Sequence, residues 1–310
     1  MNSPATFQAM MDNYFEDLIN KGGTVIYMDD ILIHAKTKEQ LMRRTKQVLD
    51  WLKKHNLYLN INKCFFEKEE VEYLGCVISH DTIKMDLIKL SGIRHWPPPM
   101  TVKQTQSFLG FGNFYQKLIS GFAHIAWPLH DLTKKNKTWE WTKECQSTFD
   151  TLKEKFMTAP VLTMADVNKP FILETDALKW VIGATLMQKD SNGDLHPCGF
   201  LSHALTLTER NWQIYDQELY VIIYALDEWK HLLLGAEHTL TIHCDHKNLT
   251  YYKSPQRLTP CQAQWWNNLS RYNFNLVHLP GTKPTLYTPP QVLVDSLWTP
   301  RLLRTPQDSL

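Results

Sequence analysis

The chain has 310 residues, 43% of them hydrophobic and 21% charged, and a formal net charge of +1 at pH 7. This balance excludes a highly charged disordered chain, and the length suits two compact units, because soluble domains commonly have ~100–200 residues. A polyanionic partner would have to be held by a local basic face or by metal ions, since the whole molecule carries almost no net charge.

The N-terminal residues predict a helix followed by a β-hairpin. Ser3 can cap free backbone N–H groups, and Pro4 is tolerated at a first helical position. An apolar stripe with helical spacing follows, made of Phe7, Met11, Tyr14 and Leu18. Two β-type runs, 24–27 and 31–34, then flank Asp29 and Asp30. The pattern therefore predicts a hairpin with two carboxylates at its tip.

A second helix is predicted from a capping box. Thr37 and Gln40 have the required spacing, and Leu41, Val48 and Leu52 continue an apolar face. Residues 36–63 are rich in lysine and arginine, which fits either a solvated helix face or a site for a polyanion. Residues 71–79 read as one strand, and the proline run at 97–99 reads as a rigid break between units.

The remaining chain divides into a helical stretch and an α/β stretch. Residues 101–165 look helical, with apolar faces formed by Phe108, Phe111, Phe114, Tyr115, Phe149, Leu152 and Phe156. From residue 170 the predicted strands are 170–176, 180–188, 196–202, 239–245 and 274–279, and the predicted helices are 207–233 and 260–272. This order favours a mixed α/β domain with its own sheet, followed by an irregular, proline-rich tail.

Three acids in the α/β stretch form a candidate metal site. Asp176 and Asp245 each close a predicted strand, and Glu218 lies at the edge of the buried stripe of the helix expected to begin at the Thr206/Glu209 capping box. An unpaired carboxylate is costly there. Hard oxygen ligands suit Mg²⁺, and two such ions can cleave a phosphodiester, although each acid alone is also a common cap or surface charge.

Several segments resemble the RNase H domain of gypsy-like long-terminal-repeat retrotransposons. They are residues 171–177 (FILETDA), 183–184 (GA), 205–212 (LTLTERNW), 216–219 (DQEL), 241–250 (TIHCDHKNLT) and 279–281 (LPG). The resemblance implies that Asp176, Glu218 and Asp245 are three of the four metal-binding acids of that nuclease. The family's fourth acid follows the Pro-Gly pair closely, whereas here Asp295, the nearest candidate, comes later after an apparent insertion.

The N-terminal part resembles the second half of the reverse transcriptase of the same elements. Residues 2–8 (NSPATFQ) look like the segment near the incoming nucleotide and 27–30 (YMDD) like the catalytic hairpin, followed by 59–64 (LNINKC) and 72–75 (EYLG). The resemblance implies that Asp29 and Asp30 are catalytic, metal-binding acids. It further implies nucleic-acid contacts for Gln8, Lys63, Tyr73 and Gly75, with the 72–75 segment at the primer end.

The resemblance covers about residues 2–281 and implies an α/β (α+β) architecture. We expect a truncated reverse transcriptase palm and the start of a thumb (1–90), a helical thumb and connection (91–165), an RNase H-like mixed-sheet domain (166–283) and an irregular tail (284–310). The implied function is metal-dependent cleavage of RNA in RNA–DNA hybrids, with two Mg²⁺ or Mn²⁺ ions. RNA–DNA hybrid and template–primer are the implied partners.

Two alternatives stay open. One is a decayed retroelement fragment that binds nucleic acid without chemistry, and the other is a working polymerase. Because the family takes a further catalytic aspartate from a strand that precedes the first residue, we expect no autonomous polymerase activity. No apolar run is long enough to span a bilayer and no secretory signal pattern is present, so we expect an intracellular protein without a membrane partner. The oligomeric state is left undecided.

Other potential ligands are better explained as structural residues. Trp265, Trp266, Tyr251 and Tyr252 could stack on bases but are more often core residues, and His203, His243 and His246 show no metal-ligand spacing. The six cysteines form no C-x-x-C pair, so we expect reduced, mostly buried thiols.

Overall fold

The structure, a computed structural model, describes residues 3–178, 180–245 and 260–279. Several predicted features lie outside these residues, namely the proline-rich tail, Tyr251, Tyr252, His246 and the candidate fourth acid Asp295. Among the described helices, none is long and apolar enough to cross a membrane. Three hydrophobic cores follow one another along the chain.

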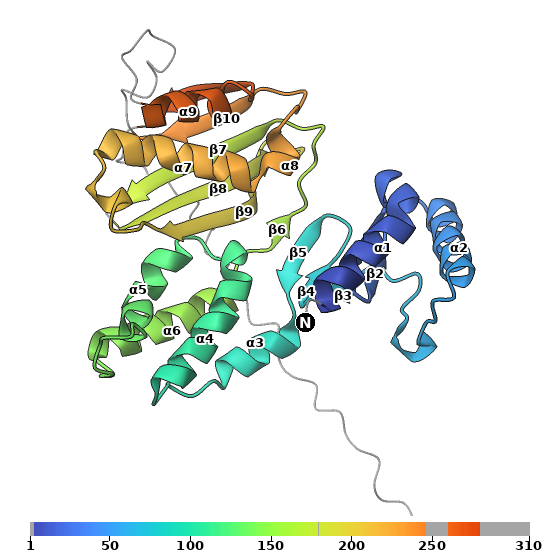
Figure 1. The fold of residues 1–310 in the computed structure, drawn as a ribbon, viewed down its shortest axis with the longest axis horizontal. Coiled ribbons are helices and arrows are strands. Elements are labelled where there is room, and N and C mark those ends of the chain that lie inside the picture. Colours follow the sequence, from blue (N-terminus) through green and yellow to red (C-terminus); the bar gives the residue numbers. More distant parts are fainter. Residues whose placement is uncertain (1–2, 179, 246–259, 280–310) are drawn as a thin grey trace, which may run out of the picture.

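The first core confirms the predicted helix, hairpin and helix. Helix α1 (Ser3–Asn20) and helix α2 (Lys38–Lys54) pack with a two-stranded antiparallel sheet, β1 (Thr24–Tyr27) and β2 (Asp30–Ile33), at the right of Figure 1. The core residues are Met11, Phe15, Leu18, Ile26, Val48 and Leu52. The Thr37 side chain accepts the N–H of Gln40 at 3.3 Å, as its capping position predicts.

The segment 71–79 is a hairpin, so the prediction of one strand was wrong. Strands β3 (Val71–Tyr73) and β4 (Cys76–Ile78) pair antiparallel around a turn at Leu74 and Gly75, whose φ angles are 49° and 74°. Two consecutive positive φ angles match the twist of a two-residue hairpin, and glycine accommodates its share without strain. The sheet continues through β5 (Thr82–Met85) to β6 (Leu162–Thr163).

The second core is mainly helical, as predicted for residues 101–165. It contains α3 (Leu87–Arg94), α4 (Val102–Tyr115), α5 (Phe122–Leu132) and α6 (Lys143–Met157). The proline run joins two helices of this core and does not separate two cores, because Ile93 and Phe108 belong to one cluster. Phe114 was predicted on an apolar face but is 61% exposed, because it lies on the outer side of α4.

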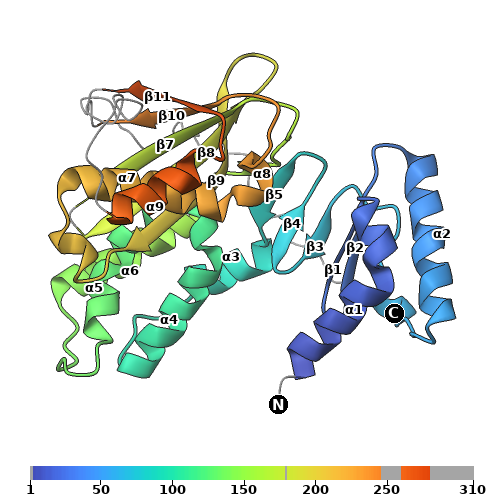
Figure 2. The ribbon, with the colours of Figure 1, turned by 45° about the horizontal axis from the view of Figure 1, so that its top comes forward.

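The C-terminal sheet is mixed, as the predicted order of elements required. Its five strands follow the order β11-β10-β7-β8-β9. They are β7 (Phe171–Leu178), β8 (Val181–Lys189), β9 (Leu195–Ala204), β10 (Leu240–Cys244) and β11 (Phe274–His278). The first three form an antiparallel meander, and β10 runs parallel to both β7 and β11. Figure 2 shows helices α7 (Ile214–Glu228) and α9 (Pro260–Leu269) on the same face of this sheet.

The long helix of this domain begins later than predicted. The Thr206/Glu209 capping box forms, because the N–H of Thr206 donates to Glu209 Oε2 at 2.7 Å, but it closes only the short 3-10 helix η3 (Glu209–Asn211). Trp212 is extended and interrupts the helix before Ile214. After Glu228 the helix breaks again, and the short helix α8 (Lys230–Leu233) follows.

Candidate metal centre

Strand β7 carries Asp176 near its end. Its residues alternate between fully buried and partly buried, so Leu173 and Thr175 face the helix-covered core while Asp176 points to the other face. The buried Thr175 hydroxyl donates to the carbonyl of His243 on the neighbouring strand β10 at 3.2 Å. This bond fixes the ends of the two strands against each other.

The pairing of β10 with β7 places Asp245 beside Asp176. The strands are parallel, and His243 lies opposite Glu174. Asp245 and Asp176 each follow that pair by two residues, so the register places them at the same edge of the sheet. Asp245 is exposed and Asp176 is partly buried.

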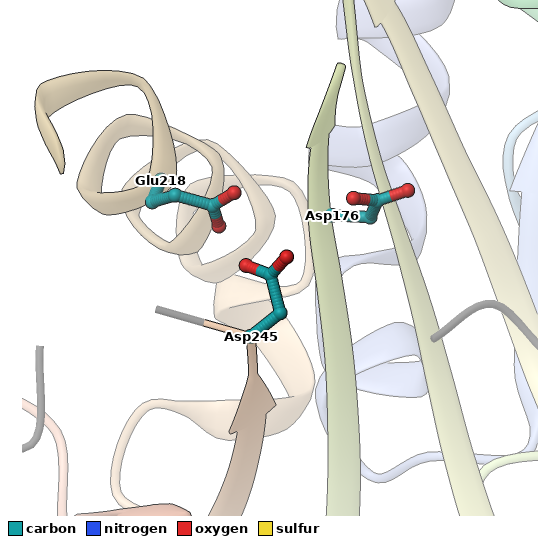
Figure 3. Close-up of side chains that lie close together, drawn as sticks. All are labelled: Asp176, Glu218 and Asp245. Carbon is teal, nitrogen blue, oxygen red and sulfur yellow. The ribbon is translucent and has the colours of Figure 1, made fainter. Parts of the chain in front are cut away.

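Glu218 approaches the same edge from helix α7. Its side chain is 2% exposed, and its Oε2 atom is buried without a hydrogen-bond partner among the described residues. A buried, unsatisfied carboxylate oxygen is costly in free energy, so this position is suited to a cation. In Figure 3, Glu218 and Asp245 point toward each other and Asp176 lies on β7 beside them. One oxygen from each of the three acids lies within 4.8 Å of the others.

The three acids perturb one another's ionisation. Burial, together with the charges of Asp245 and Asp176 and a hydrogen bond with Asp245, raises the pKa of Glu218 to about 8. Burial and the charge of Asp245 also raise the pKa of Asp176, although the backbone N–H of Ala177 and the charge of His124 oppose this rise. Both shifts mean that the cluster resists full ionisation unless positive charge is added.

These residues fit a hard divalent cation. All three donors are carboxylate oxygens, which Mg²⁺ and Mn²⁺ prefer, and the buried Glu218 oxygen has no other partner among the described residues. The spacing allows the three groups to share one ion. A second ion about 3.5–4 Å away would need more ligands from the substrate, from water or from further acids. In the described part of the chain, this is the one group of three or more candidate ligand residues.

The structure places the other predicted pair of acids at an exposed turn. Asp29 and Asp30 lie at the β1–β2 turn and both are exposed. Gln8 braces this turn, because its Oε1 accepts the N–H of Met28 at 2.5 Å and its Nε2 donates to the carbonyl of Ile26 at 3.3 Å. Met28 has a φ of 55°, which is strained for this residue, so the Gln8 bond supports an unfavourable conformation.

The other residues with implied nucleic-acid contacts do not all lie beside this hairpin. Tyr73 is near it, because burial and the charge of Asp30 both raise the pKa of Tyr73. Gly75 lies in the β3–β4 turn, and its carbonyl accepts the hydroxyl of Tyr115 from α4 at 2.9 Å. Lys63 is exposed in the short 3-10 helix η1 (Ile61–Lys63).

The histidine, tryptophan and cysteine residues mostly have structural surroundings. His203 stacks on Tyr224 with ring centroids 4.6 Å apart, and Trp265 packs against the C-terminal core. Both surroundings agree with the prediction that these residues are structural. The five cysteines whose side chains are described are free, and Cys145 and Cys244 are buried while the other three are partly buried. None of these five thiols lies at an exposed residue.

One residue near the acids was missed by the sequence analysis. His124 lies on α5, far from the acids in the sequence, and yet its charge acts on Asp176. No motif marked this histidine, because its proximity depends on how the helical core packs against the sheet.

The fold and the acid triad define an RNase H-like class of domain, and a family model supports this assignment. Residues 141–242 match the model described as "RNase H-like domain found in reverse transcriptase". Residues 1–78 match the model described as "Reverse transcriptase (RNA-dependent DNA polymerase)". The chain thus combines a reverse transcriptase part and an RNase H-like part.

Curated relatives specify the kind of polyprotein. Over 293 residues the chain is 33% identical to the retrovirus-related Pol polyprotein from transposon opus of Drosophila melanogaster, with coverage of 90% of the chain and 29% of the relative. It is 31% identical over 284 residues to the transposon Tf2-3 polyprotein of Schizosaccharomyces pombe, with coverage of 90% and 21%. The chain is therefore related to retrotransposon Pol polyproteins and spans less than a third of their length.

Solved structures agree on the fold. The foamy viral protease-reverse transcriptase in complex with an RNA/DNA hybrid matches with a TM-score of 0.72 and 22% identity, and covers 98% of this chain and 41% of that chain. The same protein in complex with double-stranded DNA matches with a TM-score of 0.71 and 22% identity, and covers 92% and 60%. At this identity the likeness confirms the mixed α/β architecture.

Proposed function

We propose that the chain is a metal-dependent endonuclease that hydrolyses the RNA strand of RNA–DNA hybrids, as part of a gypsy-like retrotransposon Pol polyprotein. The observation that carries this proposal is the convergence of Asp176, Glu218 and Asp245 within 4.8 Å, with a buried and unsatisfied oxygen among them. The RNase H-like family match supports the reaction class. The printed title of a structural neighbour, a reverse transcriptase bound to an RNA/DNA hybrid, supports the substrate class.

Each acid has a distinct role in this proposal. The pairing of β7 with β10 holds Asp176, and Asp245 lies at the exposed end of β10. Together they would hold the ion where the scissile phosphate can reach it. Glu218 closes the site from the protein side. Bound divalent ions supply a water with a lowered pKa and charge that stabilises the leaving oxygen. Asp295 stays a candidate for a fourth ligand, outside the described residues.

The N-terminal hairpin does not complete a comparable site within the described residues. Asp29 and Asp30 are exposed, and no third acid of the described chain joins them in a cluster. Polymerases need acids that hold two metals against the triphosphate and the primer hydroxyl. We therefore propose that this chain alone does not extend a primer, and that Gln8 acts mainly by holding the hairpin.

The test is cleavage of an RNA–DNA hybrid labelled on the RNA strand, by the whole chain in Mg²⁺ or Mn²⁺. We expect RNA products, an intact DNA strand and no products in EDTA. Asp176→Asn should abolish cleavage, and Asp194→Asn, at an exposed acid in the β8–β9 turn, should not. Equal cutting by wild type and Asp176→Asn would reject the assignment of the site.

A fragment that binds nucleic acid without chemistry is the alternative function, and the buried Glu218 carboxyl offers one observation for it. With a pKa of about 8, Glu218 can stay protonated and the cluster can persist without a metal. Hybrid binding that survives EDTA, with no products at any concentration of Mg²⁺ or Mn²⁺, would favour this function.

A further inference from the structure

One row of residues that face each other across β7, β8 and β9 runs from the acid cluster to the helical core. Asp176 lies directly opposite Gly183 on β8, and Gly183 lies opposite Ser202 on β9. Residues opposite each other in antiparallel strands face the same side, so the side chains of Asp176 and Ser202 share one face. Gly183 places no side chain between them, and two strand spacings separate the ends of the row by about 10 Å.

Helix α5 begins on this row. The backbone N–H of Ala123, in the first turn of the helix, donates to the Ser202 hydroxyl at 2.9 Å. The next residue is His124, whose side chain is exposed. The charge of His124 lowers the pKa of Asp176, which agrees with an imidazole near the acid cluster. A residue of the helical core thus stands beside the candidate metal centre.

A cluster of two indoles and one guanidinium helps to hold α5 in this place. The guanidinium carbon of Arg210 lies 4.6 Å from the ring centroid of Trp127 on α5 and 5.2 Å from that of Trp180, which precedes β8. Arg210 Nε also donates to the carbonyl of Leu205 at 2.8 Å. Cation–π contacts of this kind stabilise the packing of α5 against the start of β8.

Two further contacts join the helical core to the C-terminal domain. The Lys117 ammonium lies 2.6 Å from Glu228 Oε1, at the end of α7. Phe200 of β9 is 3% exposed and belongs to the hydrophobic cluster of the helical core. Contacts at Phe200 and Ser202 of β9 and in the first half of α5 fix the position of His124 relative to the acids.

We propose that the nuclease site is composite, and that His124 of the helical core is a further substrate-binding residue that contacts a backbone phosphate of the nucleic acid beside the metal position. The inference rests on the proposed nuclease function. The three acids repel phosphate when no ion is bound. An exposed N–H donor beside them, such as the His124 imidazole, can offset this repulsion by donating a hydrogen bond to the phosphate. Ser202, on which α5 begins, lies about 10 Å across the sheet from Asp176, so the contacted phosphate would lie within a few nucleotides of the cut.

The first test measures binding without chemistry. Full-length Asp245→Asn protein in EDTA is titrated into a fluorescent RNA–DNA hybrid, with and without His124→Ala. Hydrogen bonds to charged groups contribute about 1.5–3 kcal/mol, so the alanine variant should bind at least about tenfold more weakly. His124→Gln and His124→Arg keep an N–H donor and should restore part or most of the affinity. His231→Ala, an exposed histidine on α8, is the matched control.

The second test measures cleavage in the otherwise wild-type chain. His124→Ala should raise KM for the hybrid with a smaller change in kcat, and thermal unfolding should match that of wild type. Affinity and KM equal to those of His231→Ala, or no recovery with glutamine and arginine, would overturn the inference. If wild type cuts nothing, the proposed function fails, but the EDTA titration still decides whether His124 binds the hybrid.

Discussion

The two acidic sites of this chain use the same residue types in opposite surroundings. In the C-terminal domain Asp176, Glu218 and Asp245 converge within 4.8 Å, and Glu218 is 2% exposed. At the N-terminal hairpin Asp29 and Asp30 are exposed to solvent at a tight turn. Solvent screens the second pair, whereas Glu218 of the first cluster lies where water cannot compensate its charge.

This difference distinguishes a short acidic motif in the sequence from a site where burial of a carboxylate favours a bound cation. An exposed acidic turn is tolerated at almost no cost, so its presence alone says little about chemistry. A cluster in which burial and neighbouring acids raise the pKa of Glu218 to about 8 is costly, and its cost is relieved when a cation binds. We therefore expect substitutions in the two sites to differ in both sign and size.

The largest expected effect is on catalysis. Asp245→Asn should reduce hybrid cleavage by at least about 100-fold, because even outer partners of metal ligands cost 10–100-fold when they are lost. Asp29→Asn should leave cleavage unchanged. Rates measured under single-turnover conditions in Mg²⁺ would compare the two variants, and equal losses in both would break the distinction between the sites.

The next effect is on stability as a function of pH. Glu218 has a folded pKa of about 8 against its ordinary value of 4.5, so between these values the folded state keeps a proton that the unfolded state has lost. In EDTA the free energy of unfolding should therefore fall as pH rises from about 4.5 to about 8, by a few kcal/mol at about 1.4 kcal/mol per pKa unit. Glu218→Gln should flatten this dependence and raise Tm at pH 8.

Two controls sharpen this pH prediction. Glu237→Gln, at an exposed position, should leave the pH dependence as it is in wild type. Mg²⁺ at pH 8 should raise the Tm of wild type more than that of Glu218→Gln. In wild type the bound ion compensates the negative charge of the Glu218 carboxylate, which the glutamine variant lacks. A pH dependence that is identical in Glu218→Gln and wild type would show that other groups dominate.

A smaller effect is expected where neutral hydrogen bonds support the hairpin. Gln8→Ala removes the acceptor of the Met28 N–H and should destabilise the turn by about 1 kcal/mol. Hydrogen exchange at the Met28 amide should become about fivefold to tenfold faster. Gln47→Ala, on an exposed part of α2, should have no such effect.

The smallest effect is expected at the exposed acids themselves. Asp29→Asn and Asp30→Asn should change stability by less than about 0.5 kcal/mol, and Mg²⁺ should not alter this difference. Denaturant midpoints with and without Mg²⁺ would measure it. A strong Mg²⁺ dependence of the Asp30→Asn effect would indicate a metal site at the hairpin after all.

Local patterns predicted most elements but missed features that depend on turns and packing. The apolar stripe of α1, the strand that carries Asp176 and the strand that leads into Asp245 were predicted correctly. The hairpin at Leu74 and Gly75 was missed, because alternation of apolar residues continues through a two-residue turn. The start of α7 was misplaced, because a capping box can close a 3-10 turn as well as an α-helix.

The amino-acid sequence by itself determined the elements, the three acids of the C-terminal domain and the family resemblance, because periodicity, caps and motifs are local along the chain. Only the tertiary structure decided that Asp176, Glu218 and Asp245 meet, since they come from two parallel strands and a helix brought together by β10 pairing with β7. It also decided that His124 lies beside them. The physical reason is that burial and electrostatic coupling depend on distances in space, which sequence separation does not fix.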